Sequence, residues 1–140
     1  MPPITIEITV NALAEKAWEF YTNPEHVMKW NHASDDWHSP RAENDLRVGG
    51  TFNYRMEAKD GSFGFGFDFG GTYTAVTPFE YIAYTMGDGR TVAVTFTSNG
   101  SETKITTMFD PETENPIEMQ RDGWQAILNN FKKCVEVSSE

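Results

Sequence analysis

The stretch that decides the fold runs from Asn115 to Val137 and reads NPIEMQRDGWQAILNNFKKCVEV. Apolar residues recur in it at spacings of three and four, which is the pattern of a helix with one apolar side. That side comprises Ile117, Trp124, Ile127, Leu128, Phe131 and Val135. Asn115 is the expected N-cap, with Pro116 in the first turn and Glu118 at the capping-box position. We therefore expect a long amphipathic helix whose apolar side covers another layer of the protein.

The N-terminal part of the chain predicts one strand followed by two short helices. From Ile4 to Val10, apolar and polar residues alternate, which is the period of a half-buried strand. Asn11 is the expected N-cap of a first helix, and Asn23 with Pro24 ends that helix. Pro24 also suits the first turn of a second short helix, which carries Trp30.

The middle of the chain predicts a polar loop and then an antiparallel meander. Residues 31–40 have no usable period, and we expect them to form a loop. Turn signals beyond it, such as Asp60-Gly61 and Asn99-Gly100, separate about six strands. The expected inward residues are Phe52, Tyr54 and Met56; Phe63, Phe65, Phe67, Phe69 and Tyr73; Val92, Val94 and Phe96; and Thr103, Ile105, Thr107 and Phe109. From 80 to 86 the pattern fits either Tyr81, Ala83 and Thr85 or Ile82, Tyr84 and Met86. A sheet of this length curls, and the C-terminal helix is large enough to cover its concave face.

This order of elements resembles the helix-grip fold of the START-like (SRPBCC) superfamily. Several strings resemble its branch named for the homologue of the heat-shock-protein-90 ATPase activator. They are Asn23-Pro24-Glu25 with Trp30, residues 44–50, Asp60-Gly61, Gly71-Thr72-Tyr73, Asp88-Gly89-Arg90, and residues 120–124 with Leu128 and Phe131. The resemblance implies an α+β, helix-grip fold: a curved antiparallel β-sheet wrapped around a long C-terminal α-helix, with two short helices after strand 1. Because it covers nearly the whole chain, we expect residues 1–140 to form a single domain.

Composition narrows the classes of partner. The formal net charge is -10 at pH 7, and the eleven basic residues form no run, which argues against binding to nucleic acid. The sequence shows neither a signal-peptide pattern nor an apolar run long enough to span a bilayer, so we expect no membrane insertion. The single cysteine, Cys134, permits no internal disulfide. We expect a soluble cytoplasmic protein that is a monomer or a homodimer.

Motifs of catalysis and of metal or cofactor binding are missing from the sequence. His26, His32 and His38 lack the spacing of a metal-binding pair on one helix, and no cysteine lies near them. No nucleophile elbow is present, and the glycines of residues 64–71 lack the helix and lysine of a phosphate loop. Strand parity points Asp68 outward, into solvent. We therefore expect no metal, no cofactor and no catalytic residue recognisable from a motif.

What remains is the space between the concave sheet and the C-terminal helix, which either packs solid or leaves a cavity for an apolar ligand. The candidate lining residues are Trp30, Trp37, Phe52, Tyr54, Phe67, Phe69, Tyr73, Val94, Phe96, Trp124, Leu128 and Phe131. The family resemblance favours the cavity. Our leading hypothesis is non-catalytic binding of a small hydrophobic molecule: a lipid, a polyketide or another aromatic compound.

Two other functions stay open. The resemblance also implies a possible chaperone partner, with the chain acting as a cochaperone that stimulates a heat-shock-protein-90-type ATPase. Enzymes of the cyclase or dehydratase type occur elsewhere in the superfamily, and here Tyr54 or Tyr73 would serve as an acid or base. Two arginines, Arg47 and Arg121, are expected to pair with acidic residues at the rim, and Gly123 is expected to let a strand approach the helix closely.

Overall fold

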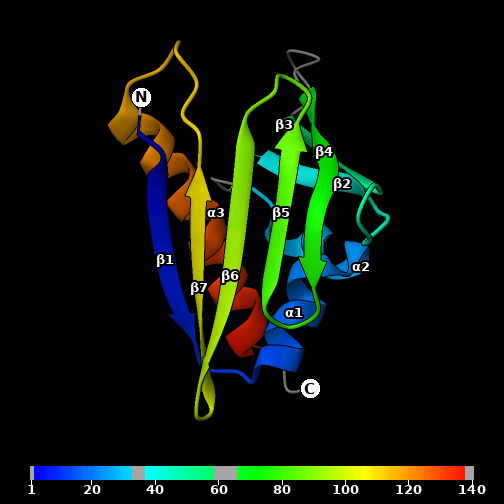
Figure 1. Cartoon of the computed structure of the whole chain (residues 1–140), viewed down its shortest axis with the longest axis vertical. Coiled ribbons are helices and arrows are strands. Elements are labelled where there is room, and N and C mark those ends of the chain that lie inside the picture. The colour runs from blue at the N-terminus through cyan, green and yellow to red at the C-terminus, as the bar shows by residue number, and fades with distance from the viewer. Residues whose placement is uncertain (1, 33–36, 59–65, 138–140) are drawn as a thin grey trace.

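The computed structural model describes residues 2–32, 37–58 and 66–137, whose arrangement is shown in Figure 1. The elements in chain order are β1 (Ile4–Val10), α1 (Ala14–Thr22), α2 (Pro24–Trp30), β2 (Trp37–Asn44), β3 (Thr51–Ala58), β4 (Gly66–Thr77), β5 (Tyr81–Met86), β6 (Thr91–Asn99), β7 (Glu102–Phe109) and α3 (Ile117–Val137). The strands form one seven-stranded antiparallel sheet in the order β1-β7-β6-β5-β4-β3-β2. The predicted α+β, helix-grip-like arrangement is confirmed.

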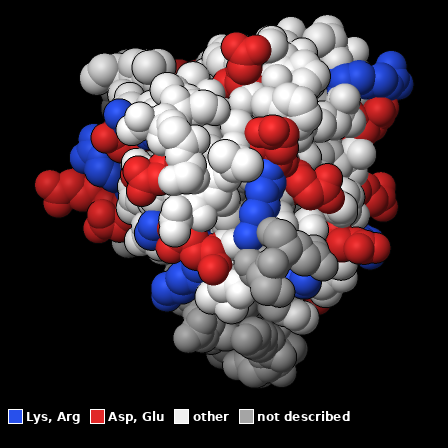
Figure 2. Space-filling model, turned by 90° about the horizontal axis from the view of Figure 1, so that it is seen from below, with Lys and Arg blue, Asp and Glu red and all other residues white. Residues whose placement is uncertain are grey.

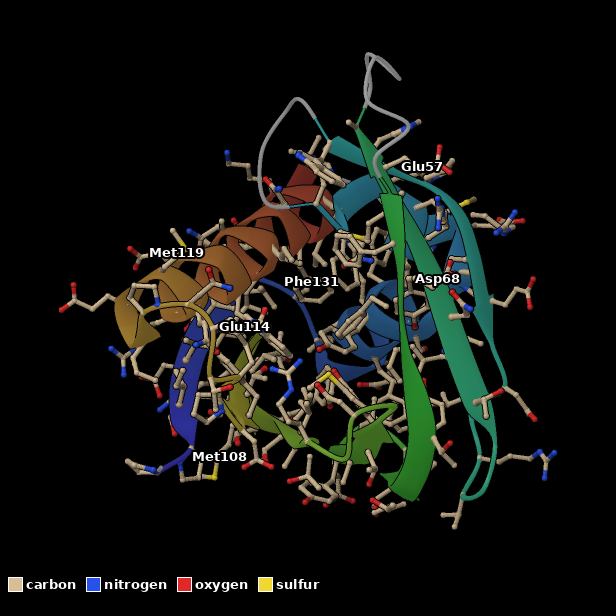
Figure 3. All side chains as sticks on the ribbon, turned by 90° about the horizontal axis from the view of Figure 1, so that it is seen from above. Glu57, Asp68, Met108, Glu114, Met119 and Phe131 are labelled. Carbon is tan, nitrogen blue, oxygen red and sulfur yellow. The ribbon has the colours of Figure 1, made fainter. Side chains whose placement is uncertain are left out.

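The sheet curls around the interior, and the helices cover its concave side. Seen from above, the strands curve around the interior and α3 lies across the side that they leave open (Figure 3). On α3, Phe131 faces this interior and is fully buried, whereas Met119 is 60% exposed on the outer side. The main sheet contact of α3 is with β1 and that of α2 is with β2, the two edge strands. Because the helices meet the sheet chiefly near its edges, space can remain beside the middle strands β4 and β5.

The predicted inward faces are confirmed for most strands. Alternation of burial along β1, β3, β6 and β7 matches the period-two pattern of a sheet with one covered face. For β5, which the sequence left undecided, the buried residues are Ile82, Tyr84 and Met86. On β4, Tyr73 is buried and Phe69 is half-buried, but Phe67 is 50% exposed. The predicted inward residues Phe63 and Phe65 lie outside the described residues.

The junction between α1 and α2 is set by Asn23 and Pro24, as predicted. The Asn23 side chain accepts a hydrogen bond from the backbone N–H of Glu25 at 3.0 Å, and Pro24 occupies the first helical turn. The predicted cap of α1 is wrong: Leu13 is its N-cap and makes no side-chain capping bond. The backbone N–H of Asn11 instead donates to the Glu136 carboxylate at 2.8 Å, which ties the end of β1 to α3.

The start of α3 also differs from the prediction. The helix begins at Ile117, so Pro116 and not Asn115 precedes its first residue. The backbone N–H of Asn115 donates to the Glu112 carboxylate at 2.7 Å, and its side-chain amide donates to the same carboxylate at 3.2 Å. Asn115 therefore stabilises the turn before the helix, and does not cap the helix itself.

Strand β2 begins at Trp37, inside the segment that the sequence predicts to be a loop. It is an edge strand, and its pairing with β3 shifts register between His38 and Arg41. An edge strand with such an irregularity tolerates Pro40, which cannot donate to a neighbouring strand. The Ser39 hydroxyl adds a bond to the Arg55 carbonyl at 2.8 Å. The broken register removes the alternation by which a strand is recognised.

Close backbone approach occurs at Gly71 and not at Gly123. A Cβ atom at Gly71 would lie 2.6 Å from the carbonyl oxygen of Thr85 on β5, whereas no atom lies within 4 Å of the Cβ position of Gly123. The predicted role of Gly123 is therefore wrong. Gly71 instead lets the middle strands of the curved sheet pack together.

Charged side chains of both signs are mixed over the face shown in Figure 2. Several form ion pairs across elements or within a helix, such as Lys104 with Glu7 at 3.2 Å and Lys132 with Glu136 at 2.6 Å. Within the described ranges, no helix is both long enough and apolar enough to cross a membrane.

Candidate functional site

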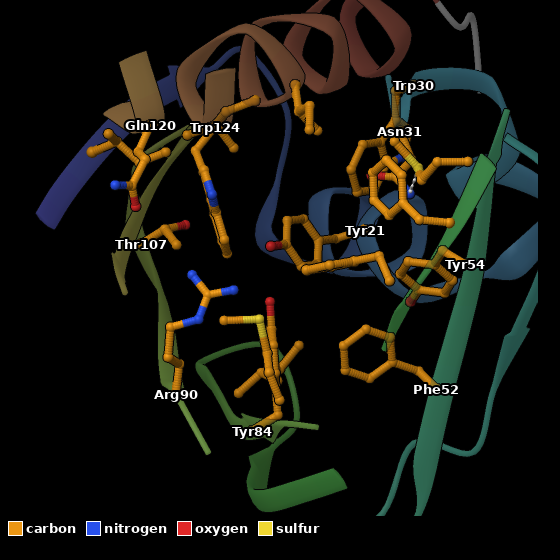
Figure 4. Close-up of a pocket in the computed structure, with 18 of the residues that line it drawn as sticks. Tyr21, Trp30, Asn31, Phe52, Tyr54, Tyr84, Arg90, Thr107, Gln120 and Trp124 are labelled. Atoms are coloured by element: carbon orange, nitrogen blue, oxygen red, sulfur yellow. Dashed lines mark hydrogen bonds between the residues drawn. The ribbon is translucent and has the colours of Figure 1, made fainter. Parts of the chain in front are cut away.

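A cavity of about 360 Å³ lies between the concave face of the sheet and the helices (Figure 4). Its aromatic lining residues are Tyr21, Trp30, Phe52, Tyr54, Phe67, Phe69, Tyr73, Tyr84 and Trp124. The aliphatic and sulfur-containing ones are Ile6, Met56, Ile82, Met86, Ile127 and Leu128, and the polar ones are Thr22, Asn31, Arg90, Thr107, Glu112, Asn115 and Gln120. Because Phe67 and Asn115 are exposed residues of the lining, the cavity reaches the surface. Its volume falls in the range of about 300–1,000 Å³ that is usual for small-molecule sites.

Aromatic contacts hold the sheet side of the cavity in place. The ring of Phe52 lies 4.7 Å from that of Tyr84, 5.0 Å from Tyr54 and 5.4 Å from Tyr73, measured between centroids. These residues come from β3, β4 and β5, so three neighbouring strands share one packed aromatic layer. A wall built in this way presents large apolar surfaces with little freedom to collapse into the space beside it.

The helix side of the cavity is formed around Trp124. Its indole stacks on Phe109 of β7 with 3.9 Å between centroids and meets the edge of Phe69 on β4 at 5.9 Å. Trp30 from α2 contributes a second indole, whose N–H donates to the Phe20 carbonyl at 2.9 Å. Because that N–H is satisfied within the protein, the Trp30 ring can face the cavity as an apolar surface.

A hydrogen-bonded chain connects the wall formed by β3 and β4 to β2 and to the end of α1. The Tyr73 hydroxyl donates to the Asn44 side chain at 2.6 Å, and the Asn44 amide donates to the Thr22 carbonyl at 2.7 Å. The Tyr54 hydroxyl is hydrogen-bonded to Tyr73. Burial raises the pKa of Tyr73 to about 12 and the pKa of Tyr54 well above its ordinary value. Both phenols are therefore neutral at physiological pH, where they can donate hydrogen bonds but cannot act as bases.

Two further tyrosines project toward the centre of the cavity, as Figure 4 shows for Tyr21 and Tyr84. The Tyr21 hydroxyl is hydrogen-bonded to the Thr107 hydroxyl on β7. Burial raises the pKa of Tyr21 and of Tyr84 far above the ordinary range of a phenol. The centre of the cavity thus holds neutral hydroxyl groups in an apolar surround.

One end of the cavity is polar and well organised. The buried Gln120 side chain accepts from the Glu112 backbone N–H at 2.8 Å and donates to the carbonyls of Glu112 and Asn115 at 3.1 and 2.8 Å. It therefore fixes the segment that joins β7 to α3. Arg90 lies at the same end, where its Nε donates to Asp88 at 2.7 Å.

Eight of the predicted site residues line this cavity: Trp30, Phe52, Tyr54, Phe67, Phe69, Tyr73, Trp124 and Leu128. The structure places Trp37, Val94, Phe96 and Phe131 outside its lining. The ring of Tyr21 contacts both Phe96 and Phe131 edge-on, at 5.5 and 5.3 Å between centroids. Tyr21 therefore lines the cavity at this point in place of Phe96 and Phe131.

The other two excluded residues have different surroundings. Val94 is fully buried in the solid part of the core. Trp37 is half-buried on the edge strand β2, where its ring lies 5.9 Å from that of Phe67.

Several lining residues were not predicted from the sequence, among them Tyr21, Tyr84, Arg90 and Gln120. Tyr84 could have been found from strand pairing, since it lies directly opposite Tyr73 on β4. Arg90 and Gln120 gave no usable signal, because a turn arginine and a helical glutamine are usually solvated.

Three other residues considered from the sequence, His26, Asp68 and Arg47, make contacts that stabilise the fold. The His26 ring stacks on Phe20 with 3.9 Å between centroids, and the described residues contain no cluster of side chains suited to a metal ion. Asp68 is exposed and pairs with Arg55 at 3.7 Å, in agreement with its predicted outward direction. Arg47 pairs with Asp45 at 3.0 Å, as predicted.

Comparison with known proteins assigns the chain to a family. The model of the family described as activator of Hsp90 ATPase homolog 1-like protein (AHSA1) matches residues 11–136. The chain belongs to the AHSA1 family. It is similar to the solution structure of an AHSA1-like protein from Aeromonas hydrophila, with 41% identity and a TM-score of 0.87 over 96% of this chain and 93% of that one. No curated protein matches the chain.

Two more solved structures bear on this AHSA1-family fold. Chr148 from Cytophaga hutchinsonii is 52% identical, with a TM-score of 0.82 over 96% of this chain and 92% of that one. The Aha1 dimer from Colwellia psychrerythraea is 19% identical, with a TM-score of 0.73 over the full length of both chains. At that identity the likeness shows the fold alone, and the dimer is a property of that protein.

Proposed function

We propose that this AHSA1-family chain acts in the cytoplasm as a single domain that binds one small apolar or aromatic molecule in the cavity, without catalysing a reaction. The observation that carries the proposal is the volume of about 360 Å³ enclosed by aromatic side chains from the sheet and the helices. Moving an apolar molecule from water into such a lining is favourable, at about 25 cal/mol per Å² of apolar surface removed from water. A molecule that fills the cavity would stabilise the fold.

The ionisation of the lining residues argues against a tyrosine that acts as a base. The four tyrosines keep their protons at physiological pH, because burial raises the pKa of each. Among the described lining residues, Glu112 is the only carboxylate, and it is engaged by two hydrogen bonds from Asn115. A cyclase or dehydratase that used Tyr54 or Tyr73 as a base would require the opposite shift of pKa.

The family description raises cochaperone activity as the alternative function. Its match covers residues 11–136, so the resemblance to the activator is not confined to a short motif. An ATPase assay of a heat-shock-protein-90-type chaperone, with and without this protein, separates the two functions. Stimulation that persists in a variant with a blocked cavity would favour the cochaperone role.

Titration with N-phenylnaphthylamine, an uncharged aromatic probe that fluoresces in apolar surroundings, tests the ligand-binding proposal. We expect one saturable site, and we expect Trp124→Ala to weaken binding because Trp124 lines the cavity. The control is Trp18→Ala: Trp18 is a buried indole packed against Phe96 at 5.2 Å, and unlike the half-buried Trp124 it does not line the cavity. Equal loss of binding in the two variants, or no saturable binding at all, would refute the proposal.

A further inference from the structure

The lining of the cavity includes one strongly basic group. Arg90 directly precedes β6, after the turn that follows β5, and its side chain is 27% exposed. The turn is held by a backbone hydrogen bond from Met86 to the Arg90 carbonyl at 2.7 Å. Of the described lining residues, Arg90 alone carries a permanent positive charge. A guanidinium beside an aromatic cavity, in a protein with a net charge of -10, calls for a functional explanation.

The local contacts fix the direction in which the guanidinium points. Asp88 accepts hydrogen bonds from the Arg90 backbone N–H at 3.1 Å and from its Nε at 2.7 Å. These two bonds anchor the base of the side chain at the turn. The two terminal nitrogens then point into the cavity, toward the space between Thr107, Trp124 and Tyr84 (Figure 4).

Three acidic groups lie near this end of the cavity, and each is engaged by other donors. Asp88 is 54% exposed and bonds the turn itself. Asp110 accepts from the backbone N–H and hydroxyl of Thr91 at 2.8 and 2.9 Å, and these bonds hold the pKa of its carboxyl below the ordinary value. Glu112 accepts two bonds from Asn115. Among the described residues, none of these carboxylates forms a hydrogen bond with the terminal nitrogens of Arg90.

The groups beside these nitrogens are neutral donors of hydrogen bonds. The Tyr84 hydroxyl points to the same space, and the Thr107 hydroxyl lies on its other side (Figure 4). The guanidinium edge formed by the two terminal nitrogens matches the paired oxygens of a carboxylate or a similar anion, and such charge-assisted bonds are stronger where water is scarce. A purely apolar ligand would place an apolar surface against these two terminal nitrogens, which is unfavourable.

We propose that the ligand of this cavity is amphipathic: an apolar or aromatic body packed against Phe52, Phe69 and Trp124, and a single anionic oxygen group, carboxylate-like, bound by Arg90 with Tyr84 beside it. The inference rests on the proposed function, because it names the class of molecule that the same cavity takes. It excludes polyanions, since the other charged groups around this end of the cavity are acidic.

A matched pair of probes separates the two claims. Anilinonaphthalenesulfonate carries one anionic group, and N-phenylnaphthylamine has nearly the same aromatic body without it. We expect Arg90→Met to weaken binding of the sulfonate about tenfold, since a hydrogen bond to a charged group contributes about 1.5–3 kcal/mol and 1.4 kcal/mol is tenfold. Binding of the neutral probe should change less than about twofold.

The control variant is Arg47→Met. Arg47 forms the same kind of pair, from its Nε to the aspartate two residues earlier, but it is 70% exposed and does not line the cavity. Both probes should bind this variant as they bind the native protein. A second measurement needs no variant: dodecanoate should displace the neutral probe at a concentration at least about tenfold lower than dodecanol does.

The outcomes distinguish the proposals. If neither probe binds saturably, the proposed function itself fails. If both probes bind but Arg90→Met weakens them equally, or dodecanol displaces as well as dodecanoate, the cavity binds apolar molecules without recognising an anion, and the inference is overturned. Selective loss of the sulfonate in Arg90→Met alone supports it.

Discussion

Replacing Ile82 with Phe tests whether the cavity is open in solution. Ile82 is 2% exposed, belongs to the inner face of β5 and lines the cavity. The larger side chain can enter a volume of about 360 Å³, so the free energy of unfolding should fall by less than about 1 kcal/mol. The same ring occupies space that a ligand needs, and binding of N-phenylnaphthylamine should weaken about tenfold. Urea unfolding followed by tryptophan fluorescence, together with a probe titration, measures both effects.

The matched control is the same substitution at Ile105. This residue lies on the inner face of β7, is fully buried and does not line the cavity. Overpacking a solid core costs about 1–3 kcal/mol, so Ile105→Phe should destabilise the protein by that amount and leave the affinity of the folded protein unchanged. If Ile82→Phe costs as much as Ile105→Phe, the space beside β5 is closed in solution, and the reasoning is refuted.

Three further predictions concern the fold that holds the cavity. Asn23→Ala should lower the free energy of unfolding by about 0.5–2 kcal/mol, because the side chain caps α2. The control Asn11→Ala should change it by less than about 0.5 kcal/mol, because Asn11 does not cap α1. Urea unfolding midpoints measure both changes, and equal losses in the two variants would contradict the capping role of Asn23. Gly71→Ala should destabilise the protein by about 1–3 kcal/mol, because its Cβ would lie 2.6 Å from a carbonyl oxygen of the next strand. The control Gly87→Ala should have a smaller effect, because its Cβ enters open space. A melting temperature that falls as little for Gly71→Ala as for Gly87→Ala would show that the strands separate easily. Burial raises the pKa of Tyr73 to about 12, so between about pH 10 and that value the unfolded chain loses a proton that the folded protein keeps, and the free energy of unfolding falls. Tyr73→Phe should remove about 1.3 kcal/mol of the fall that urea titrations measure between about pH 9 and pH 11, and an equal fall in the variant and the native protein would count against the assigned shift.

The sequence predicted the strands well wherever one face is covered throughout. In β3 and β7 every second side chain is buried, and the alternation of residue types follows directly. It failed for β2, because an edge strand with a register shift at Pro40 needs no regular alternation. The parity of β5 could be resolved only by its neighbour, since both of its faces carry apolar residues.

The cavity could be predicted only in part. Side-chain pattern shows which residues face inward, but Phe52 beside the cavity and Phe96 in the solid core have the same pattern. The difference depends on where the helices contact the sheet. Tyr21 of α1 packs against Phe96 and Phe131, whereas the main helix contacts with the sheet are at the edge strands β1 and β2, away from its middle strands. Arg90 faces the cavity because Asp88 anchors it at a turn, a contact that composition and period do not encode.

The most direct test of the account is the location of a bound apolar molecule. Two-dimensional NMR spectra recorded during titration with N-phenylnaphthylamine report this location residue by residue. The account predicts one saturable site, with the largest shifts at the indole N–H of Trp124 and the backbone of β4 and β5. In Ile82→Phe the same shifts should need about tenfold more probe to reach half of their full size. Shifts confined to exposed apolar residues such as Val48 and Met119, or shifts that never saturate, would contradict it.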